Sequence, residues 1–340
     1  MIIRSKAFTI LMLLIGCVGA NATTQPLAQR IAQHDGWVGY EVPINADGGI
    51  PCCYNWHGKH AVTSGCDLEG GEWNLGMDDH NSAPSTTAST DALDVYIRIT
   101  QGKIDRVRAF AASCPVRGRE QVRWLDDVAA EDSIMLLASQ ASEPGPRKDE
   151  DEALLAMALH ADAAATEALA TLSGAGHPRK LREQSLFWLG QMRGADGARI
   201  VEHAATTDGD AELRANAVFA LSQAKAADGY AAIHRIALSD SSEHVREQAL
   251  FWMAQMGDAR AKDDIIAAIR KDASPKVREQ AVFALSQLKH SDADAALIAV
   301  VRGDYPREVK QQALFWLGQS GSDQAMDFLD QVLSKAPAKG

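Results

Sequence analysis

The chain is short of basic residues, with 34 lysines and arginines against 45 aspartates and glutamates and a formal net charge of -11. A chain this acidic has no general attraction for phosphate backbones or anionic lipid, so we expect no nucleic-acid partner. Long apolar runs are scarce as well. Beyond the first residues no stretch approaches the roughly 20 apolar residues of a membrane span. We therefore expect no membrane insertion once those first residues are removed.

Motifs of the common enzyme classes are also missing. The sequence has no nucleophile elbow, no phosphate-binding loop and no metalloprotease helix motif. Its most concentrated polar region contains His57, His60 and His80, but the H-x2-H spacing lacks a recognisable third-ligand motif. We therefore expect a non-enzymatic protein with no cofactor and no metal. The alternative is a metal-dependent or enzymatic N-terminal module that the rest of the chain presents.

The start of the chain is typical of an export signal. A short basic region, an apolar run over residues 7–15 and the small-residue sequence 20-ANA-22 follow one another. We predict a signal peptide at residues 1–22 and a location in the periplasm or outside the cell. The alternative is an outer-membrane lipoprotein, because 14-LIGC-17 resembles a bacterial lipobox with Cys17 as the lipidated residue.

Cleavage after residue 22 leaves four cysteines, namely Cys52, Cys53, Cys66 and Cys114. An even number in an oxidising compartment predicts two disulfides. Adjacent cysteines rarely pair, because the bond would distort the peptide between them. We therefore expect Cys52 and Cys53 to reach separately to Cys66 and Cys114. A four-cysteine zinc site is the alternative, but it lacks the usual C-x2-C spacing.

Residues 23–116 are predicted to form a small β-rich module that disulfides staple. The clearest strand signal is 93-LDVYIRIT-100, in which apolar and polar residues alternate. Gln101-Gly102 is a plausible tight turn, and 104-IDRVRAF-110 would return as the second strand. This hairpin would bring Cys114 back towards the earlier cysteines.

A repeat with a period of 32 residues organises the rest of the chain. The segment 245-VREQALFWMAQMGD-258 has counterparts at 181-LREQSLFWLGQMRG-194, 213-LRANAVFALSQAKA-226, 277-VREQAVFALSQLKH-290 and 309-VKQQALFWLGQSGS-322. Self-similarity at such a period is the signature of stacked repeats. We predict a mainly α chain, a right-handed α-solenoid of helix pairs. The second helices carry an apolar column at the same period: Leu137, Leu169, Val201, Ile233, Ile265, Leu297 and Leu329.

Five regular units are predicted at residues 179–335, followed by a tail at residues 336–340. Degenerate capping units would precede them at residues 117–178, because an end unit has one face without a neighbour. In this region we expect the chain to become helical from Arg119. The apolar residues that would be in register there are Val122, Trp124, Leu125 and Val128.

The first helix of each unit has two different faces. Val245, Ala249, Met253 and Met256 share one stripe, which is predicted to be buried. The opposite face carries glutamines and a phenylalanine in every regular unit: Gln184, Phe187, Gln191, Phe219, Gln223, Gln248, Phe251, Gln255, Gln280, Phe283, Gln287, Gln312, Phe315 and Gln319. The residue after each phenylalanine alternates, as Trp188, Ala220, Trp252, Ala284 and Trp316, which suggests a working unit of two repeats.

Two interpretations of this second face remain open. In the structural one, stacked glutamines bond one another or neighbouring backbone, and phenylalanine fills the seam between first helices. In the binding one, the amides bond the main chain of an extended peptide and the rings receive its side chains. A protein or peptide partner follows from the second interpretation.

A charged column is predicted to join the units. Aspartates precede a basic residue by six positions in the pairs Asp208 and Arg214, Asp240 and Arg246, Asp272 and Arg278, and Asp304 and Lys310. Such aspartates would lie before the first helices. There they could bond the N-terminal amides and pair with arginines of the same or the adjacent unit.

The pattern D-x5-R with V-R-x2-A-x3-L and a following G-D-x2-A is similar to HEAT-like repeats, the short type also present in phycobilin lyase subunits. The likeness covers residues 117–335 and implies that the V-R helix lines a concave surface, with Gln248, Phe251 and Gln255 facing the groove. It does not imply lyase activity. The layout also resembles exported bacterial HEAT-repeat proteins with a cysteine-bearing N-terminal module. We therefore expect an exported, non-enzymatic interaction scaffold.

Overall fold

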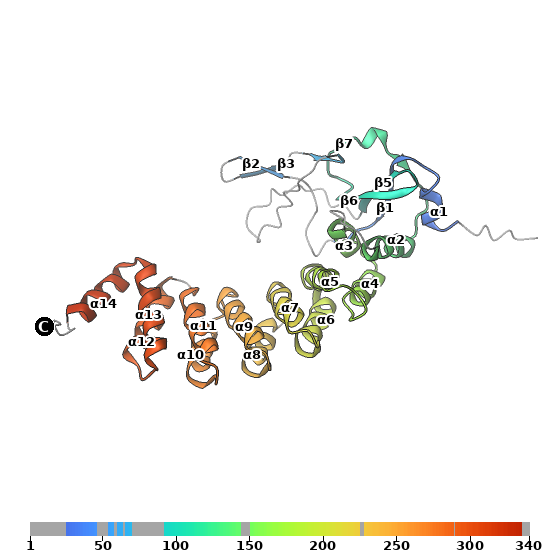
Figure 1. The fold of residues 1–340 in the computed structure, drawn as a ribbon. Helices are drawn as coiled ribbons and strands as arrows, with labels where there is room; N and C mark the ends of the chain where they lie inside the picture. The colour runs from blue at the N-terminus through green and yellow to red at the C-terminus, as the bar shows by residue number, and fades with distance from the viewer. Residues whose placement is uncertain are drawn as a thin grey trace, which may run out of the picture.

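The computed structural model consists of a β-rich N-terminal module followed by a long α-solenoid (Figure 1). None of its described helices is both long and apolar enough to span a bilayer. The residues that the structure describes are 25–45, 54–57, 60–63, 65–69, 92–143, 150–224, 228–288 and 290–334. The predicted signal peptide, Cys17, Cys52, Cys53, His80 and the C-terminal tail lie outside them.

A four-stranded sheet forms the body of the module, with the strand order β6-β5-β1-β8. Strand β1 runs antiparallel to β5 and parallel to β8. The bounds of the sheet strands are β1 (Gly36–Pro43), β5 (Ala92–Thr100), β6 (Lys103–Ala111) and β8 (Arg123–Trp124). The smaller elements are α1 (Leu27–Ile31), β2 (Tyr54–His57), β3 (His60–Thr63), β4 (Cys66–Asp67), β7 (Val116–Arg117) and the short 3-10 helix η2 (Arg119–Gln121).

The predicted hairpin is confirmed as β5 and β6, which pair from Leu93 with Ala111 to Thr100 with Lys103. Gln101 and Gly102 form the turn with φ angles of 54° and 75°. Positive φ at both central residues is the geometry whose twist matches that of the flanking strands. The sequence therefore located this turn correctly from its Gly and the alternation on either side.

The buried cysteines lie close to one another in the fold. Cys66 begins β4, which pairs in parallel with β7, and its backbone N–H donates to the carbonyl of Pro115 at 2.8 Å. Cys114 immediately precedes that proline, so β6 returns it to the neighbourhood of Cys66 as the hairpin predicted. Because Cys52 and Cys53 lie outside the described residues, the pairing of the four cysteines stays a prediction.

The helix expected from Arg119 is wrong. The chain there forms η2 and then β8, and the first long helix begins only at Ala130. A Cβ on Gly39 of β1 would lie 2.7 Å from Val122 and 3.3 Å from Trp124, so both side chains pack on bare backbone. The apolar residues that matched the helical register therefore serve the edge of the sheet instead. Strand β8 belongs to the module, not to a capping repeat.

The solenoid is built from helix pairs. Helices α2 (Ala130–Ser142), α3 (Glu150–Ala158) and α4 (Ala164–Leu172) precede the regular units. The first helices of the regular units are α5 (Arg179–Met192), α7 (Ala211–Gln223), α9 (Glu243–Gln255), α11 (Pro275–Ser286) and α13 (Arg307–Ser320). Their second helices are α6 (Gly194–Thr207), α8 (Gly229–Ser239), α10 (Ala261–Lys271), α12 (His290–Arg302) and α14 (Asp323–Ser334).

The predicted apolar columns form the core of the solenoid. Val245, Ala249 and Met253 are fully buried, as are the second-helix residues from Leu137 to Ile265, while Leu329 at the last unit is partly buried. Each first helix packs closely on the next first helix, whereas second helices touch one another much less. The row therefore curves with its first helices on the concave side, which faces the module (Figure 1).

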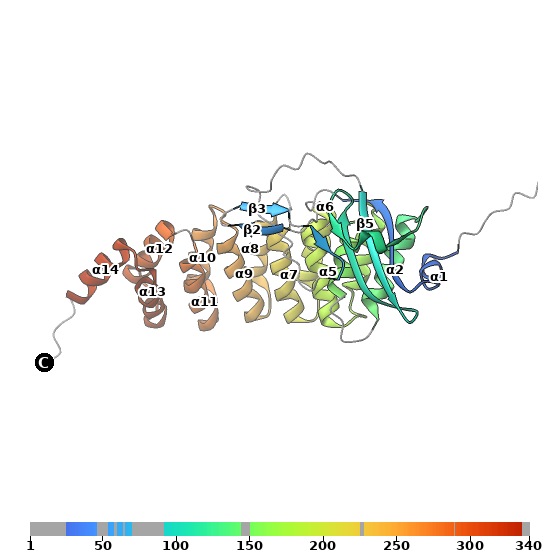
Figure 2. The same cartoon turned by 90° about the horizontal axis from the view of Figure 1, so that it is seen from above.

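Backbone hydrogen bonds dock the module on the solenoid. The end of β1 continues into a bridge between Ile44 and His160, flanked by bonds from Asn45 N–H to the Leu159 carbonyl (2.7 Å) and from Ala161 N–H to the Pro43 carbonyl (2.9 Å). In the perpendicular view the module lies over the first helices at this end of the row (Figure 2). The module therefore closes the N-terminal end of the solenoid.

A buried chain of side-chain hydrogen bonds crosses the same interface. Tyr40 of β1 lies 2.8 Å from the Ser133 hydroxyl of α2, which lies 2.9 Å from Nε2 of His160. Nδ1 of His160 is 2.7 Å from the Ala156 carbonyl, so it carries the proton and Nε2 accepts. Burial lowers the pKa of His160 to about 4, because an imidazolium there would lose its hydration. The neutral ring is therefore the form that the interface requires.

We expect acidification to weaken this interface before the acidic residues titrate. The unfolded histidine takes up a proton near its ordinary pKa of 6.5, whereas the folded one resists protonation down to about pH 4. Stability that depends on neutral His160 is therefore complete above pH 6.5 and is lost as the pH falls towards 4. The loss should be on the order of 3 kcal/mol, measured by urea unfolding at pH 7 and pH 4.5.

The matched variants are His160→Gln and, on the exposed surface of α6, His203→Gln. The first should be less stable than the wild type at pH 7 but should lose less on acidification. The second should behave as the wild type does. An equal loss in all three proteins would show that His160 is not the group responsible.

Candidate partner-binding face of the solenoid

Arginines at the start of the first helices join consecutive units. Arg214 of α7 donates to both carboxylate oxygens of Asp240 at 2.8 Å and to the backbone carbonyl of Asp208 at 2.8 Å. Arg246 of α9 repeats this with Asp272 (2.8 and 3.1 Å) and with the carbonyl of Asp240 (2.8 Å). Each arginine thus holds the loop of its own unit and the aspartate of the next. We call this arrangement the arginine clamp.

The aspartates of the clamp also organise the loops before the first helices. Asp240 accepts the backbone N–H of Ser242 at 2.8 Å, and Asp272 accepts that of Ser274 at 2.9 Å. Burial alone would raise the pKa of Asp240. The hydrogen bonds from Arg214 and Ser242 outweigh it, so this pKa lies below its usual value, and that of Asp272 is lowered in the same way. Both carboxylates are therefore charged at neutral pH.

The ends of the clamp series differ from its middle. Arg182 of α5, which the predicted set omits, binds Asp208 and the Ser173 carbonyl. Its position one period before Arg214 was the signal that could have found it. Arg278 keeps only the backbone half, bonding the Asp272 carbonyl at 2.8 Å. Within the described residues Asp304 and Lys310 form no ion pair, so this last predicted pair is not brought together.

The five phenylalanines line the concave side as a row of ring contacts. Phe187 stacks on Phe219 with a centroid distance of 5.9 Å and an interplanar angle of 20°. Two units later Phe251 stacks on Phe283 at 6.0 Å and 7°. These four rings are partly buried, so each keeps some surface open to solvent. Phenylalanine therefore fills the seams between helices without being removed from the surface.

Tryptophans connect one stack to the next. Trp252 lies 4.7 Å from Phe219 and 5.0 Å from Phe251, so it bridges the two stacks. Trp316 has the same relation to Phe283 (4.9 Å) and Phe315 (5.0 Å). Neighbouring units are thus joined alternately by a phenylalanine stack and by a phenylalanine–tryptophan contact. The Trp/Ala alternation therefore gives the ring contacts a period of two repeats.

The glutamines follow the aromatic row without bonding one another. Gln223 and Gln287 donate only to the serine that precedes each of them, at 3.0 Å. In the described part of the chain, the side chains of Gln248, Gln280 and Gln312 form no hydrogen bond with any residue, although all three are half-buried. The described glutamines therefore form no amide ladder, whereas the stacked phenylalanine rings do fill the seams that the structural interpretation assigned to them. We call the aromatic row with its glutamines the first-helix face.

The remaining predicted residues of this face divide by exposure. Gln184 and Gln191 of α5 are half-buried, and the side-chain oxygen of Gln184 is buried without a hydrogen bond among the described residues. Gln255, Gln319 and Phe315 are exposed, Phe315 by 54%. The predicted residues therefore lie along one row over α5, α7, α9, α11 and α13, and Phe315 of the last unit is its most exposed ring.

A hollow of about 380 Å³ interrupts this face between α11 and α13. The residues that line it are Lys276, Glu279, Gln280, Phe283, Gln312 and Trp316. It contains a phenylalanine–tryptophan contact and two glutamines without hydrogen-bond partners in the described part of the chain. The first-helix face therefore contains a recess the size of a side chain in addition to its row of rings and glutamines.

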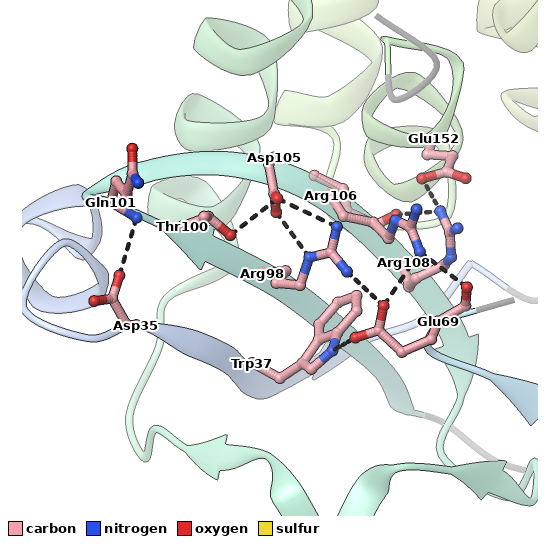
Figure 3. Close-up of polar contacts among 11 residues, drawn as sticks. Asp35, Trp37, Glu69, Arg98, Thr100, Gln101, Asp105, Arg106, Arg108 and Glu152 are labelled. Atoms are coloured by element: carbon pink, nitrogen blue, oxygen red, sulfur yellow. Dashed lines mark hydrogen bonds and ion pairs between the residues drawn. The ribbon is translucent and has the colours of Figure 1, made fainter. Parts of the chain in front are cut away.

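A cluster of polar residues beside β1, β5 and β6, by contrast, is paired internally. Glu69 accepts from Nε1 of Trp37 at 2.7 Å and forms an ion pair with Arg98, which also binds Asp105 through bonds of 2.9 and 3.2 Å (Figure 3). Arg106 donates to the Glu69 carbonyl at 3.1 Å. These groups satisfy each other across β1, β5 and β6, which is the arrangement of a structural network.

The candidate histidines of the module are only partly placed. His57 and His60 are partners in the backbone register of the β2–β3 pair, whereas His80 lies outside the described residues. Among the residues that the structure describes, no group of three or more His, Cys, Asp or Glu side chains is arranged to hold a metal ion.

Comparison with known families identifies the repeats. The family model of HEAT repeats matches residues 200–286, 230–318 and 262–339. These residues form a HEAT-repeat solenoid. The expected likeness to HEAT-like repeats is thus confirmed for residues 200–339. No curated protein matches the chain.

The HEAT-repeat solenoid is similar to several solved structures at low identity. The Escherichia coli protein YibA is 20% identical over 58% of this chain and 72% of its own, with a TM-score of 0.36. Human deoxyhypusine hydroxylase in complex with glycerol is 16% identical over 62% and 76%, with a TM-score of 0.27. The CpcE–CpcF complex of phycocyanin lyase from Nostoc is 16% identical over 60% and 82%, with a TM-score of 0.29.

We expect the substitution Asp240→Asn to destabilise the HEAT-repeat solenoid by about 3 kcal/mol. It leaves the guanidinium of Arg214, which is 9% exposed, without its carboxylate, and an uncompensated buried charge is costly. The control is Asp196→Asn, which breaks an exposed pair with Arg199 and should change stability by less than about 0.5 kcal/mol. Guanidinium unfolding followed by circular dichroism measures both. Equal midpoints for the two variants would contradict the role of the clamp.

Proposed function

We propose that this protein is a non-enzymatic interaction scaffold. It binds an extended segment of a partner protein or peptide along the first-helix face of its HEAT-repeat solenoid. One observation carries the proposal: half-buried side-chain amides without hydrogen-bond partners in the described part of the chain flank a continuous, partly open aromatic row. The amide atoms of Gln248, Gln280 and Gln312 reach solvent, so they can exchange water for the N–H and C=O groups of a bound main chain. HEAT repeats commonly mediate protein–protein interaction, which supports the same reading.

The chemistry of the face favours an extended main chain over a folded surface. A glutamine side chain offers one carbonyl and one NH2 group, which complement the N–H and C=O of a peptide unit. Gln248, Gln280 and Gln312 repeat this pair of groups once per unit along the row. The aromatic rings between them can receive apolar or cationic side chains. Amides would therefore hold the main chain while the rings select among side chains.

The spacing of the aromatic contacts sets a register for the bound segment. The contacts Phe219–Trp252 and Phe283–Trp316 lie two units apart, and packed helices are about 8–10 Å apart, so roughly 20 Å separates the two contacts. An extended chain rises about 3.3 Å per residue, and alternate side chains point to the same side. Anchor residues about six positions apart would therefore reach both contacts.

The N-terminal module would support this binding without contributing chemistry of its own. It closes one end of the HEAT-repeat solenoid and lies on the side of the first helices (Figures 1 and 2). Its described polar cluster on β1, β5 and β6 is paired internally, which favours a structural role for that cluster. A segment bound on the first-helix face would therefore have the module beside it at the α5 end.

We infer that the protein is exported and that two disulfides staple the module. The N-terminal basic, apolar and small-residue regions support export. Cys66 and Cys114 are both buried, at 1% and 4% exposure, and both take part in disulfide bonds, which supports the staples. Buried disulfides stabilise a small module chiefly by restricting its unfolded chain. A periplasmic or extracellular location follows from both inferences.

We expect the combined substitution of Gln248, Gln280 and Gln312 by alanine to abolish peptide binding without unfolding the protein. Three amide–main-chain hydrogen bonds of about 1 kcal/mol each correspond to a loss on the order of 100-fold in affinity. Peptides selected on the full-length wild type from a random phage-displayed library are the probe, and anisotropy titrations give their affinities. Circular dichroism should show an unchanged melting curve.

The matched control replaces Gln324 and Gln331, exposed on α14, by alanine. Selected peptides should bind this variant as they bind the wild type. Selection of no peptide, or equal binding to the triple variant, would count against the first-helix face as a binding surface.

Intact-mass spectrometry of the exported protein tests the inferred processing. We expect a chain that begins at Thr23, carries no lipid and gains about 4 Da on reduction, two hydrogens for each of two disulfides. A lipid-modified Cys17 at the new N-terminus would contradict signal cleavage after Ala22. A mass unchanged by reduction would contradict the disulfides.

A further inference from the structure

The hollow between α11 and α13 differs in charge from the rest of the first-helix face. It contains one cation, Lys276, and one carboxylate, Glu279, above the rings of Phe283 and Trp316. The ammonium of Lys276 does not pair with Glu279. It lies 3.1 Å from Oε1 of Glu247 on α9, a carboxylate that is only 9% exposed. The ammonium of Lys276 is therefore paired with a carboxylate of the preceding unit.

Glu279 consequently has no ionic partner among the described residues. Its side chain is half-buried beside two aromatic rings that are 4.9 Å apart. The half-buried carboxylate is negatively charged, and the faces of aromatic rings carry negative potential as well. Carboxylate and rings therefore favour the same kind of group in the hollow, a cation.

We infer that this hollow binds a basic side chain, arginine in preference to lysine, of the extended segment that occupies the first-helix face. The inference rests on the proposed function. The guanidinium would stack on the Trp316 ring and pair with Glu279, while its aliphatic stem packs on Phe283. Gln280 and Gln312 would bond the main chain on either side of it.

Arginine suits the hollow better than lysine for two reasons. A guanidinium is planar and weakly hydrated, so stacking it on an indole costs less desolvation than burying an ammonium. It also presents several donors in a fixed plane, so it can face a ring and a carboxylate together. The overall net charge of -11 favours the approach of a basic segment in addition.

The equivalent position two units earlier does not offer the same site. There Phe219 and Trp252 form the aromatic contact, but Glu212 and Ala215 replace Lys276 and Glu279. Glu212 lies 3.5 Å from the imidazole of His244, so it has a partner of its own. The unpaired carboxylate beside a phenylalanine–tryptophan contact thus belongs to the α11–α13 hollow, and this recess should prefer a basic residue more strongly.

Four labelled peptides test the inference on the full-length protein. They are about ten residues long, have the same serine and threonine background, and differ only at a central arginine, lysine, citrulline or glutamate. Citrulline keeps the shape of arginine and lacks its charge. We expect arginine to bind about tenfold more tightly than citrulline, with lysine between them and glutamate weakest. Fluorescence anisotropy measures the four affinities.

The variant Glu279→Gln separates charge from shape. It should weaken the arginine peptide about fivefold and leave the citrulline peptide unchanged, because only the first uses the carboxylate. Glu202→Gln, in a surface hollow between α6 and α8, is the matched control and should change neither peptide. Trp316→Phe keeps the packing and should reduce the preference for arginine over lysine.

Three results would overturn the inference. Equal affinity for the arginine and citrulline peptides would show that the hollow does not select a cation. An equal loss of affinity for both peptides in Glu279→Gln would show that no ion pair forms with Glu279. If none of the four peptides bound, while library-selected peptides still required Gln280 and Gln312, the inferred site for a basic side chain would be wrong. The proposed peptide-binding function would still be supported. Failure of the library-selected peptides as well would remove both.

Discussion

Each complete arginine clamp joins two consecutive units through three hydrogen bonds from one side chain, and the stacking of the middle regular units depends on it. Arg214 and Arg246 are held by a carboxylate of the next unit and by a backbone carbonyl of their own. The bidentate geometry sets the angle between consecutive first helices as well as their separation. Because each unit buries its apolar stripe only against its neighbours, a solenoid without this registration would have many similar ways to stack.

The clamp also explains how the first-helix face can be both rigid and incomplete. Clamps at the loops and the apolar stripe together hold consecutive first helices at a fixed spacing, so the aromatic rings meet at nearly constant distances of 5.9 and 6.0 Å. The glutamines then need not bond one another to keep the helices in place. Their amides remain available, half-buried and already positioned, and binding would lose little conformational freedom in the protein.

The sequence predicted the solenoid well because a repeat states each contact several times. A single helix could have been misread, but a column of apolar residues at a period of 32 could not easily arise in another fold.

The module had no such redundancy. In strand β1, Trp37 and Gly39 are buried as well as Val38, Tyr40 and Val42, and only Glu41 and Pro43 are exposed, so the alternation that marks a half-buried strand is confined to a few residues. Val122 and Trp124 fitted a helical register by spacing alone, and only the bare backbone of Gly39 shows why they form part of the sheet. The sequence could not show that the glutamines of the first-helix face lack hydrogen bonds to one another. A column of amides is equally compatible with a hydrogen-bonded ladder and with side chains that bond no other residue.

The alternation of tryptophan with alanine gives the first-helix face two kinds of contact between neighbouring first helices. Ala220 and Ala284 are buried, and their small side chains leave room for a phenylalanine stack at one junction, while Trp252 and Trp316 close the next. Two kinds of junction therefore alternate along one row, so an extended segment cannot slip by a single unit without losing its aromatic contacts. Slippage by two units would restore their shape but not their charge, because Ala215 replaces Glu279 at the earlier position. The shape of the alternating ring contacts thus limits the register of a bound segment to steps of two units. The charge of Glu279 distinguishes between the positions that remain. In this way a repetitive surface can recognise one segment in one position.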